Sequence, residues 1–303
     1  MKRRTFIKQG SVAVIGLSTG LNATAFYKPK QSTLTILHTN DVHSRIEAFP
    51  QDGSKYAGLG GAAKRAALIS RIRAEKDNVL LLDCGDIFQG TPYFNFFGGE
   101  VEFRLMSEMK YDAATIGNHD FDGGIDGLHA QMQHASFELI NANYDFSDTV
   151  MHDQVEAYRI FDKGDIKIGV TGVGIELDGL VPETLFKQTI YHDPIEAVNK
   201  QAAFLKKEAG CHYVICLSHL GYKYRGNKIS DHDLAAGSKN VDLILGGHTH
   251  TFLDKPTMIA DLEGKMVYIN QVGWAGIMLG QMEVQFEKNY KKKCVTCMPQ
   301  VIK

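Results

Sequence analysis

Residues 241–250 read Val241-Asp242-Leu243-Ile244-Leu245-Gly246-Gly247-His248-Thr249-His250, an apolar run that stops at two glycines and two histidines. The apolar half predicts a buried strand. Gly246-Gly247 then permits a sharp turn, because glycine has no Cβ to clash with the backbone. His248 and His250 are two residues apart, so on an extended chain both imidazoles would leave the same side. The stretch therefore predicts half of a metal site at the end of a strand.

Four other apolar runs end in the same manner, in side chains that bind metals. They are residues 34–38 before Asp41 and His43, 79–82 before Asp86, 113–116 before Asn118 and His119, and 213–217 before His219. Asp41 and His43 repeat the two-residue spacing and are again expected on one side of an extended chain. Ligands of α/β sheets bind beyond the carboxyl ends of the strands. We therefore expect the five clusters to meet in space.

The pattern between these runs alternates strands with helices and closes with consecutive strands. We expect helices over residues 62–73, 100–109, 123–134, 194–209 and 231–236, a loop over 88–99, a strand over 139–142, a hairpin of 160–161 with 166–173, and strands over 266–270, 276–280 and 281–286. This order indicates a mixed α/β domain with helices on both sheet faces. We assign the domain to residues 34–288 and a C-terminal tail to residues 289–303.

The first 25 residues are typical of a targeting segment rather than of the fold. They contain Lys2-Arg3-Arg4-Thr5-Phe6-Ile7-Lys8, a weakly apolar stretch at 11–17, and Ala23-Thr24-Ala25 as a small-residue cleavage pattern. Together these predict a twin-arginine-type export signal over residues 1–25, followed by a linker over 26–33. The apolar stretch is shorter than the about 20 residues that a membrane span needs. We expect an exported, periplasmic protein handled by export machinery; the alternatives are a membrane tether, if the signal is not cleaved, and a cytoplasmic leader.

Charge and cysteine content exclude some classes of function. A formal net charge of −2 gives no electrostatic case for binding nucleic acid or an acidic membrane. Five scattered cysteines do not form the framework of a small disulfide-rich protein. Cys84 and Cys216 lie inside apolar runs and are expected to be buried, and Cys211 has no assigned role. Cys294 and Cys297 are spaced like a zinc pair, but no second pair exists to complete a zinc site.

The side chains that the five runs deliver form a mixed set of oxygen and imidazole ligands. The set is Asp41, His43, Asp86, Asn118, His219, His248 and His250. Without a thiolate, it suits Mn, Zn, Fe or Co. Seven groups are too many for one ion that keeps an open position, and they fit two ions about 3.5–4 Å apart that share a carboxylate. We expect structural roles for the remaining histidines, which are His38, His129, His134, His152, His192, His212 and His232.

The ordered motifs Asp-x-His, Gly-Asp, Gly-Asn-His-Asp, a lone His and Gly-His-x-His resemble those of the calcineurin-like metallophosphoesterases. Residues 86–92, 117–122 and 270–276 are further similar to the 5'-nucleotidase branch of that family. The resemblance covers about residues 34–286, and each motif alone is a weak pattern. It implies the family fold, an αββα sandwich in which mixed β-sheet layers are flanked by helices.

The resemblance also implies roles for individual residues. One metal would be held by Asp41, His43 and His250, the other by Asn118, His219 and His248, with Asp86 bridging the two. His119 would stabilise the phosphoryl group and protonate the leaving oxygen, while Asp122 orients its ring. The branch often has Glu at the position of Asp120 and an amide at the position of His250. An imidazole at 250 favours borderline metals, so the metal preference would differ from such relatives.

The function expected from this resemblance is a dinuclear-metal hydrolase of phosphate esters. It would be a 5'-nucleotidase-like phosphomonoesterase, in which a metal-bound hydroxide attacks phosphorus in line. Relatives carry a second, C-terminal domain that grips the nucleotide, and this chain stops about where that domain would begin. Three alternatives stay open: a phosphodiesterase or pyrophosphatase for cyclic nucleotides or nucleotide-sugars, a catalytic subunit that needs a separate nucleoside-binding chain, and a non-enzymatic relic.

Three polar residues near the motifs have no firm assignment. Arg45 follows His43 and could contact a phosphate or close a salt bridge within its loop. Asn141 and Asn143 could hydrogen-bond near the site.

Overall fold

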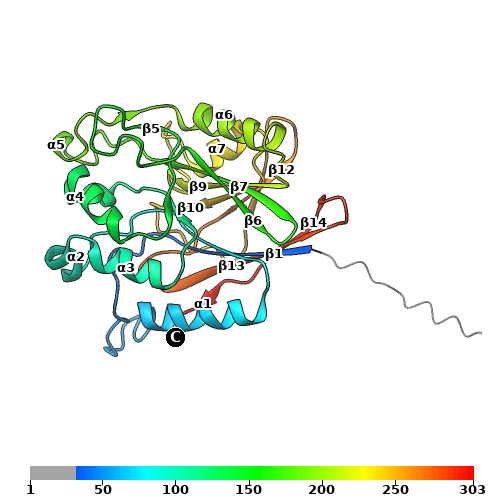
Figure 1. Ribbon diagram of the computed structural model, residues 1–303. Helices are drawn as coiled ribbons and strands as arrows, with labels where there is room; N and C mark the ends of the chain where they lie inside the picture. Colours follow the sequence, from blue (N-terminus) through cyan, green and yellow to red (C-terminus); the bar gives the residue numbers. More distant parts are fainter. Residues whose placement is uncertain (1–31) are drawn as a thin grey trace, which may run out of the picture. The chain divides into compact units, whose positions relative to one another are not determined.

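The computed structural model describes residues 32–303, so the predicted export signal at 1–25 lies outside the described residues. The first sheet contains β1 (Ser32–Thr39), β2 (Val79–Asp83), β3 (Ala113–Ala114), β4 (Glu138–Leu139), β13 (Met278–Phe286), β14 (Lys292–Cys297) and β15 (Gln300–Val301). Its order is β14-β13-β1-β2-β3-β4, with β15 also paired to β13. Figure 1 shows these strands with the helices around them.

A second large sheet packs against the first. It contains β6 (Tyr158–Lys163), β7 (Ile166–Gly174), β9 (Tyr213–His219), β10 (Leu243–Gly246), β11 (Thr257–Ala260) and β12 (Met266–Asn270). The order is β11-β12-β10-β9-β7-β6. A short pair, β5 (Tyr144–Asp145) with β8 (Ile190–Tyr191), stands apart from both sheets.

The two large sheets pack face to face. Their central strands send alternate side chains into the core between the sheets and towards the helices outside. Leu34 and Ile36 of β1 point into the core between the sheets, whereas Leu37 belongs to the core on the outer face. In β2, Leu80 and Leu81 divide in the same way. Successive side chains of a strand leave opposite faces, so a run that is apolar throughout is buried on both sides.

Helices cover the outer faces of both sheets. The first sheet is covered by α1 (Ala62–Glu75), α3 (Glu100–Glu108) and α4 (Gly124–Gln131), and the second by α6 (Pro194–Lys207) and α7 (Asp231–Gly237). The short elements are α2 (Pro92–Phe97), α5 (Glu183–Phe186), η1 (His119–Phe121) and η2 (Met132–His134). The result is a four-layer αββα sandwich, which confirms the predicted fold class.

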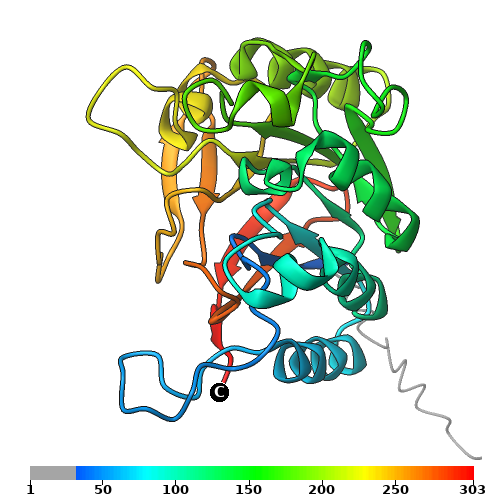
Figure 2. The ribbon, with the colours of Figure 1, turned by 90° about the vertical axis from the view of Figure 1, so that its left-hand side faces the viewer.

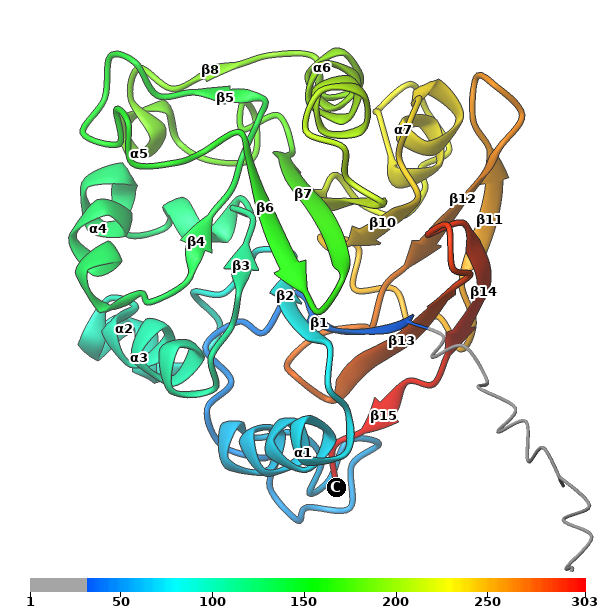
Figure 3. The same ribbon diagram turned by 45° about the vertical axis from the view of Figure 1, so that its right-hand side comes forward.

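Parallel pairing collects the strand ends on which the site depends. β1 pairs parallel with β2, and β2 with β3, while β9 pairs parallel with β10. The carboxyl ends of parallel neighbours meet at one edge of a sheet. Figure 3 shows the central strands of both sheets side by side within the helical layers.

The largest difference from the sequence prediction is at the C-terminus. Residues 289–303, assigned to a tail, contribute β14 and β15, and both strands pair antiparallel with β13. Val295 packs on the core between the sheets, and Ile302 is buried. Residues 88–99, expected as a loop, contain α2, which Pro92 begins in a position where its missing N–H costs nothing.

Cys84 and Cys216 are fully buried, as predicted. Within residues 32–303, none of the helices has both the length and the apolar character needed to span a bilayer.

Candidate metal centre

Sharp backbone turns follow the strands that deliver the candidate ligands. β1 ends at Thr39 and β10 at Gly246, so Asp41 and His248 lie beyond regular strand. Left-handed φ angles occur at five candidate ligands: Asp41 (51°), His43 (51°), Asp86 (55°), His248 (70°) and His250 (51°). The expectation of extended chain, with both histidines on one side, was therefore wrong. Non-glycine residues adopt this region at a cost of about 1–3 kcal/mol each, which tertiary contacts must offset.

The first group of candidate ligands contains Asp41, His43 and His250. The Nε2 atoms of His43 and His250 are 3.0 Å apart. Asp41 Oδ1 lies 3.4 Å from His250 Nε2 and 3.9 Å from His43 Nε2. Three ligand atoms thus converge from two distant parts of the chain and could hold one ion.

The second group contains Asp86, His219 and His248. His219 Nε2 lies 3.1 Å from Asp86 Oδ2. His248 Nδ1 lies 2.8 Å from Asn118 Oδ1, so the amide predicted as a ligand stands beside this group. The two histidines of residues 241–250 therefore belong to different groups.

Asp86 stands between the two groups. Its Oδ2 is 3.1 Å from His219 Nε2 and 3.7 Å from His43 Nε2. Burial opposes ionisation of Asp86, but charge interactions with His219 and His43 together hold its pKa below the ordinary value. An ionised carboxylate in this position can supply a ligand oxygen to a cation on either side.

The geometry of His219 fits a cation. Its Nδ1 is 2.6 Å from the carbonyl oxygen of Cys84, which makes Nδ1 the protonated nitrogen and leaves Nε2 as the acceptor. That Nε2 is buried and has no hydrogen-bond partner in the described chain. Burial lowers the pKa of His219, but Asp86 and Asp41 raise it to about 10. A divalent cation here would therefore compete with a proton.

Asn40 holds Asp41 in place, a role that the sequence did not reveal. Its Nδ2 donates to Asp41 Oδ2 and to the carbonyl oxygen of Gly273, both at 2.6 Å. Its Oδ1 accepts from the backbone N–H of Val272 at 2.9 Å. The side chain thus ties the Asp41 turn to residues 272–273.

Asp120 plays the corresponding part for Asp86. Its carboxylate accepts hydrogen bonds from the backbone N–H groups of Asp86 (3.0 Å), Ile87 (2.8 Å), Phe88 (3.1 Å) and Gly117 (2.8 Å). Burial, together with the charge of the neighbouring Asp86, raises the pKa of Asp120 to about 7. The motif Gly-Asn-His-Asp was predicted to supply a ligand and an acid, and its last residue also fixes a turn.

Residues 270–276, which the sequence analysis treated only as a mark of resemblance, support the turn that carries both histidines. Gln271 Nε2 donates to the carbonyl oxygen of Gly247 at 2.7 Å, and its Oε1 accepts from Thr251 N–H at 2.9 Å. The Trp274 ring stacks on His250, with centroids 5.6 Å apart and an interplanar angle of 5°. A family motif without an assigned ligand was the available signal for these contacts.

His119 lies beside both groups without belonging to either. Its Nδ1 is 2.8 Å from Asp122 Oδ2, and its ring centroid is 5.2 Å from that of His43. The hydrogen bond to Asp122 is the main cause of the raised pKa of His119, and burial acts in the opposite direction. The imidazole is 39% exposed, so solvent and a ligand can reach it.

The structure also shows the surroundings of the histidines expected to be structural and of the three polar residues without an assigned role. His38 is fully buried, and its Nε2 accepts from Asn270 Nδ2 at 3.0 Å. Asn141 Oδ1 accepts from the backbone N–H groups of Asn143 and Tyr144, and Asn143 Nδ2 donates to the carbonyl oxygen of Gly174. The Arg45 guanidinium lies over the Phe49 ring at 4.3 Å and makes no ion pair with residues 32–303. The six other histidines lie outside both groups.

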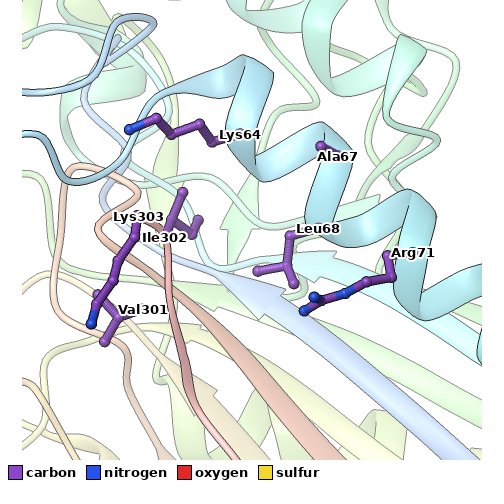
Figure 4. Close-up of a pocket in the computed structure, with 7 residues that line it drawn as sticks. All are labelled: Lys64, Ala67, Leu68, Arg71, Val301, Ile302 and Lys303. Atoms are coloured by element: carbon purple, nitrogen blue, oxygen red, sulfur yellow. The ribbon is translucent and has the colours of Figure 1, made fainter.

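A pocket of about 350 Å³ is found elsewhere on the molecule. It lies between α1 and the C-terminal residues, lined by Lys64, Ala67, Leu68, Arg71, Val301, Ile302 and Lys303 (Figure 4). None of the candidate ligands lines it. The metal centre, rather than this pocket, is the candidate functional site.

Two clusters of carboxylate and imidazole ligands on an αββα sandwich define a metal-dependent phosphoesterase class. The family model "Calcineurin-like phosphoesterase" matches residues 34–252, and the chain belongs to this family. This confirms the resemblance drawn from the sequence.

Several relatives that the chain matches are named 5'-nucleotidases. The snake venom 5'-nucleotidase of Crotalus adamanteus is 34% identical over 274 residues, covering 84% of this chain and 45% of the relative. The human 5'-nucleotidase is 30% identical over 282 residues, covering 84% and 47%. The crystal structure of a 5'-nucleotidase precursor from Thermus thermophilus superposes with a TM-score of 0.80 at 30% identity, covering 89% of this chain and 55% of that one. The chain therefore spans about half the length of the curated relatives it matches.

Proposed function

We propose that this chain hydrolyses phosphate monoesters of nucleotides with the help of two divalent cations. The observation that carries the proposal is the meeting of two donor groups at Asp86, with the His119–Asp122 pair beside them. The names of the relatives support a nucleotide as the substrate. Because the chain matches only about half of each relative, activity and substrate are both inferred.

The proposed ligand assignment follows the two groups. Asp41, His43 and His250 hold one cation, and the other is held by Asn118, His219 and His248, with Asp86 shared. Bound cations of this kind supply a nucleophile at neutral pH and offset negative charge on phosphoryl oxygens. The donor set is compatible with Mn, Zn, Fe or Co. We also infer displacement at phosphorus in line, without a covalent phosphoenzyme.

His119 supplies the proton for the leaving oxygen in this scheme. Asp122 accepts from Nδ1, which orients the ring and leaves Nε2 to donate. The raised pKa of His119 keeps a larger share of the ring protonated near neutral pH. Such positioned proton transfer typically contributes a factor of about 10²–10⁴ in rate.

An aromatic cluster beside His250 supports a substrate that carries a base. Trp274 stacks on His250, and Phe49 and Tyr56 stand at 5.9 and 6.2 Å from Trp274. Phe252 lies 6.4 Å from Tyr56 at an interplanar angle of 21° and is 38% exposed. A base can stack on such rings, whichever base it is. A separate nucleoside-binding chain that adds further contacts remains part of the proposal.

Export to the periplasm is also proposed. It rests on the paired arginines and the small-residue pattern of residues 2–25. Relatives named as venom proteins agree with export. Detection of a cleaved chain in the periplasmic fraction, lost when Arg3 and Arg4 are both changed to Lys, would test the signal.

A substrate panel tests the proposed activity. The full chain without its predicted signal is loaded with Mn²⁺ or Zn²⁺ and given p-nitrophenyl phosphate, mononucleotides, cyclic nucleotides and nucleotide-sugars. We expect the highest kcat/KM with mononucleotides, and single turnover in oxygen-18 water should place one label in phosphate. Preference for cyclic nucleotides or nucleotide-sugars would favour a phosphodiesterase. Activity no higher than that of His119→Ala on every ester would favour the non-enzymatic relic.

A further inference from the structure

The loop between β9 and α7 carries an unbalanced positive charge. Residues 221–230 include Lys223, Arg225 and Lys228 and no acidic residue. All three cations are exposed, and none forms an ion pair with the described residues 32–303. Figure 2 shows this loop, in yellow, standing out from the fold at the left.

The start of the loop is fixed to the metal centre. The backbone N–H of Tyr222 donates to Oγ1 of Thr249, the residue between His248 and His250, at 2.9 Å. The Tyr224 hydroxyl donates to the carbonyl oxygen of Leu220, the residue after His219, at 2.7 Å. Gly221 has a φ of +99°, and a Cβ there would lie 2.2 Å from the Tyr224 hydroxyl oxygen. The ring of Tyr224 therefore packs directly over the chain that carries His219.

The end of the loop is fixed as well. Ser230 and Asp233 form a capping box at the start of α7, which satisfies N–H groups of its first turn. The backbone N–H of Asp231 donates to the carbonyl oxygen of Gly221 at 2.8 Å and closes the loop. Asp231 Oδ1 also accepts from the Ser218 hydroxyl at 2.6 Å. Both ends of the loop are thus held beside the second ligand group, and the three charged residues lie between these ends.

Lys228 contacts Tyr224, the tyrosine that helps to fix the start of the loop. Its Nζ lies 5.2 Å from the centroid of the Tyr224 ring, a cation–π contact. Glu176 is the acidic group whose charge reaches Lys228, and the two do not form an ion pair within 4.0 Å. The exposed ammonium group is therefore held on Tyr224 and makes no ion pair with residues 32–303, so it can take up an anion.

We propose that the basic loop, residues 223–228, binds a second phosphate of the substrate when the reacting phosphate lies at the metal centre. Such a substrate is a compound with two linked phosphates, for example a nucleoside 5'-diphosphate, which the site would take in addition to the mononucleotides of the proposed function. This inference rests on the proposed hydrolase function. The three positive side chains of the loop together attract a doubly charged phosphate group. Dissolved salt weakens this attraction.

Charge removal tests the loop against a matched control. The triple variant Lys223→Gln/Arg225→Gln/Lys228→Gln is compared with Lys200→Gln/Lys207→Gln/Lys291→Gln, which removes the same charge from exposed positions elsewhere. We expect kcat/KM for adenosine 5'-diphosphate to fall about tenfold or more in the loop variant, chiefly through KM. The fall with p-nitrophenyl phosphate should be at least fivefold smaller, and the control should follow the wild type. Equal falls on both substrates, or none with the diphosphate, would overturn the proposal.

A binding measurement separates failure of this inference from failure of the proposed hydrolase. Methylenediphosphonate and methylphosphonate cannot be hydrolysed at their P–C bonds under assay conditions, so calorimetry reports binding alone. We expect wild-type protein to bind methylenediphosphonate about tenfold more tightly than the loop variant when both proteins are loaded with Mn²⁺. Methylphosphonate should show a smaller difference. This result would support the loop even in a protein that hydrolyses no ester; equal affinities in wild type and variant would reject it, whatever the activity.

Discussion

His119 Nδ1 lies 2.8 Å from Asp122 Oδ2, three residues further along the chain. The backbone N–H of the same histidine donates to Asp86 Oδ1, also at 2.8 Å. His119 thus contacts both Asp86, the carboxylate proposed to be shared by the two cations, and Asp122, its partner in the proposed proton transfer. The spacing is set by the 3-10 turn η1, which places residue i+3 beside residue i.

Replacement of His119 should separate chemistry from metal binding. His119→Ala is expected to keep the metal content of the wild type and to lower kcat by about 10²–10⁴, the usual range for a lost general acid. Asp122→Asn should lower kcat by less, because the ring remains but loses its charged partner. Metal analysis and steady-state kinetics check both. His152→Ala, an exposed histidine outside both groups, serves as the control. Loss of metal from His119→Ala would identify His119 as a ligand instead.

The two donor groups should lose metal independently. His250→Ala is expected to lower the bound metal by about one ion per chain, and His219→Ala to remove the other ion. Asp86→Asn should weaken both sites, because Asp86 Oδ2 faces a histidine of each group. Metal per chain is measured after dialysis against buffered Zn²⁺ or Mn²⁺. If His250→Ala and His219→Ala each lost both ions, the groups would not be separable sites.

His38 should give the fold an acid-sensitive stability. Burial lowers its pKa to about 3, whereas the unfolded chain protonates it near its model value of 6.5. Between these values the unfolded state binds more protons, so stability falls as the pH is lowered from 6.5 towards 3. His38→Gln removes this term. At about 1.4 kcal/mol per pH unit, the wild type should lose up to about 2–3 kcal/mol more than the variant between about pH 7.5 and pH 4.5.

Denaturant unfolding at both pH values gives the two differences in the free energy of unfolding. Asp83 and Asp231, whose pKa values burial raises to about 7, contribute with the opposite sign. They are present in both proteins and cancel in the comparison. Identical pH dependence of wild type and variant would mean that the folded protein accommodates a charged His38.

The convergence of the candidate ligands could be predicted from the sequence, because that convergence depends on strand topology. Apolar runs that end in polar side chains are parallel strands, and parallel strands end at one edge. The direction of each side chain was not predictable. Asp41 and His248 adopt left-handed φ angles that non-glycine residues rarely show, and a hydrogen bond from the His248 N–H to Asp41 Oδ1 joins these two turns, which lie far apart in the sequence. Reasoning from the two-residue spacing alone therefore failed at both motifs.

The C-terminal strands escaped prediction for a different reason. Lys291-Lys292-Lys293 resembles a solvated tail by composition, yet β14 is held on β13 mainly by backbone pairing. Such pairing depends on a free sheet edge, which composition does not show. The roles of Asn40 and Asp120 were hidden in the same way. Each depends on which backbone groups the fold brings near a side chain.

Asp120 should prove to be a positioning residue for Asp86. Its carboxylate receives N–H groups from both the Asp86 turn and Gly117, and it is buried. In Asp120→Asn, the amide NH₂ would face N–H donors, and each unsatisfied buried donor costs about 1–3 kcal/mol. We expect a lower Tm and weaker binding of both cations. Asp120→Glu keeps a carboxylate and should restore part of the metal affinity.

Calorimetry and metal titration together test this role. A merely structural role would lower the Tm of Asp120→Asn without changing metal affinity at a temperature where the variant is folded. A positioning role requires both to change, because the left-handed turn at Asp86 is held by N–H groups that Asp120 accepts. Asp126→Asn, at an exposed aspartate on α4, is the matched control and should change neither the metal affinity nor the Tm by more than a small amount. Wild-type metal affinity in folded Asp120→Asn would show that Asp86 keeps its position unaided.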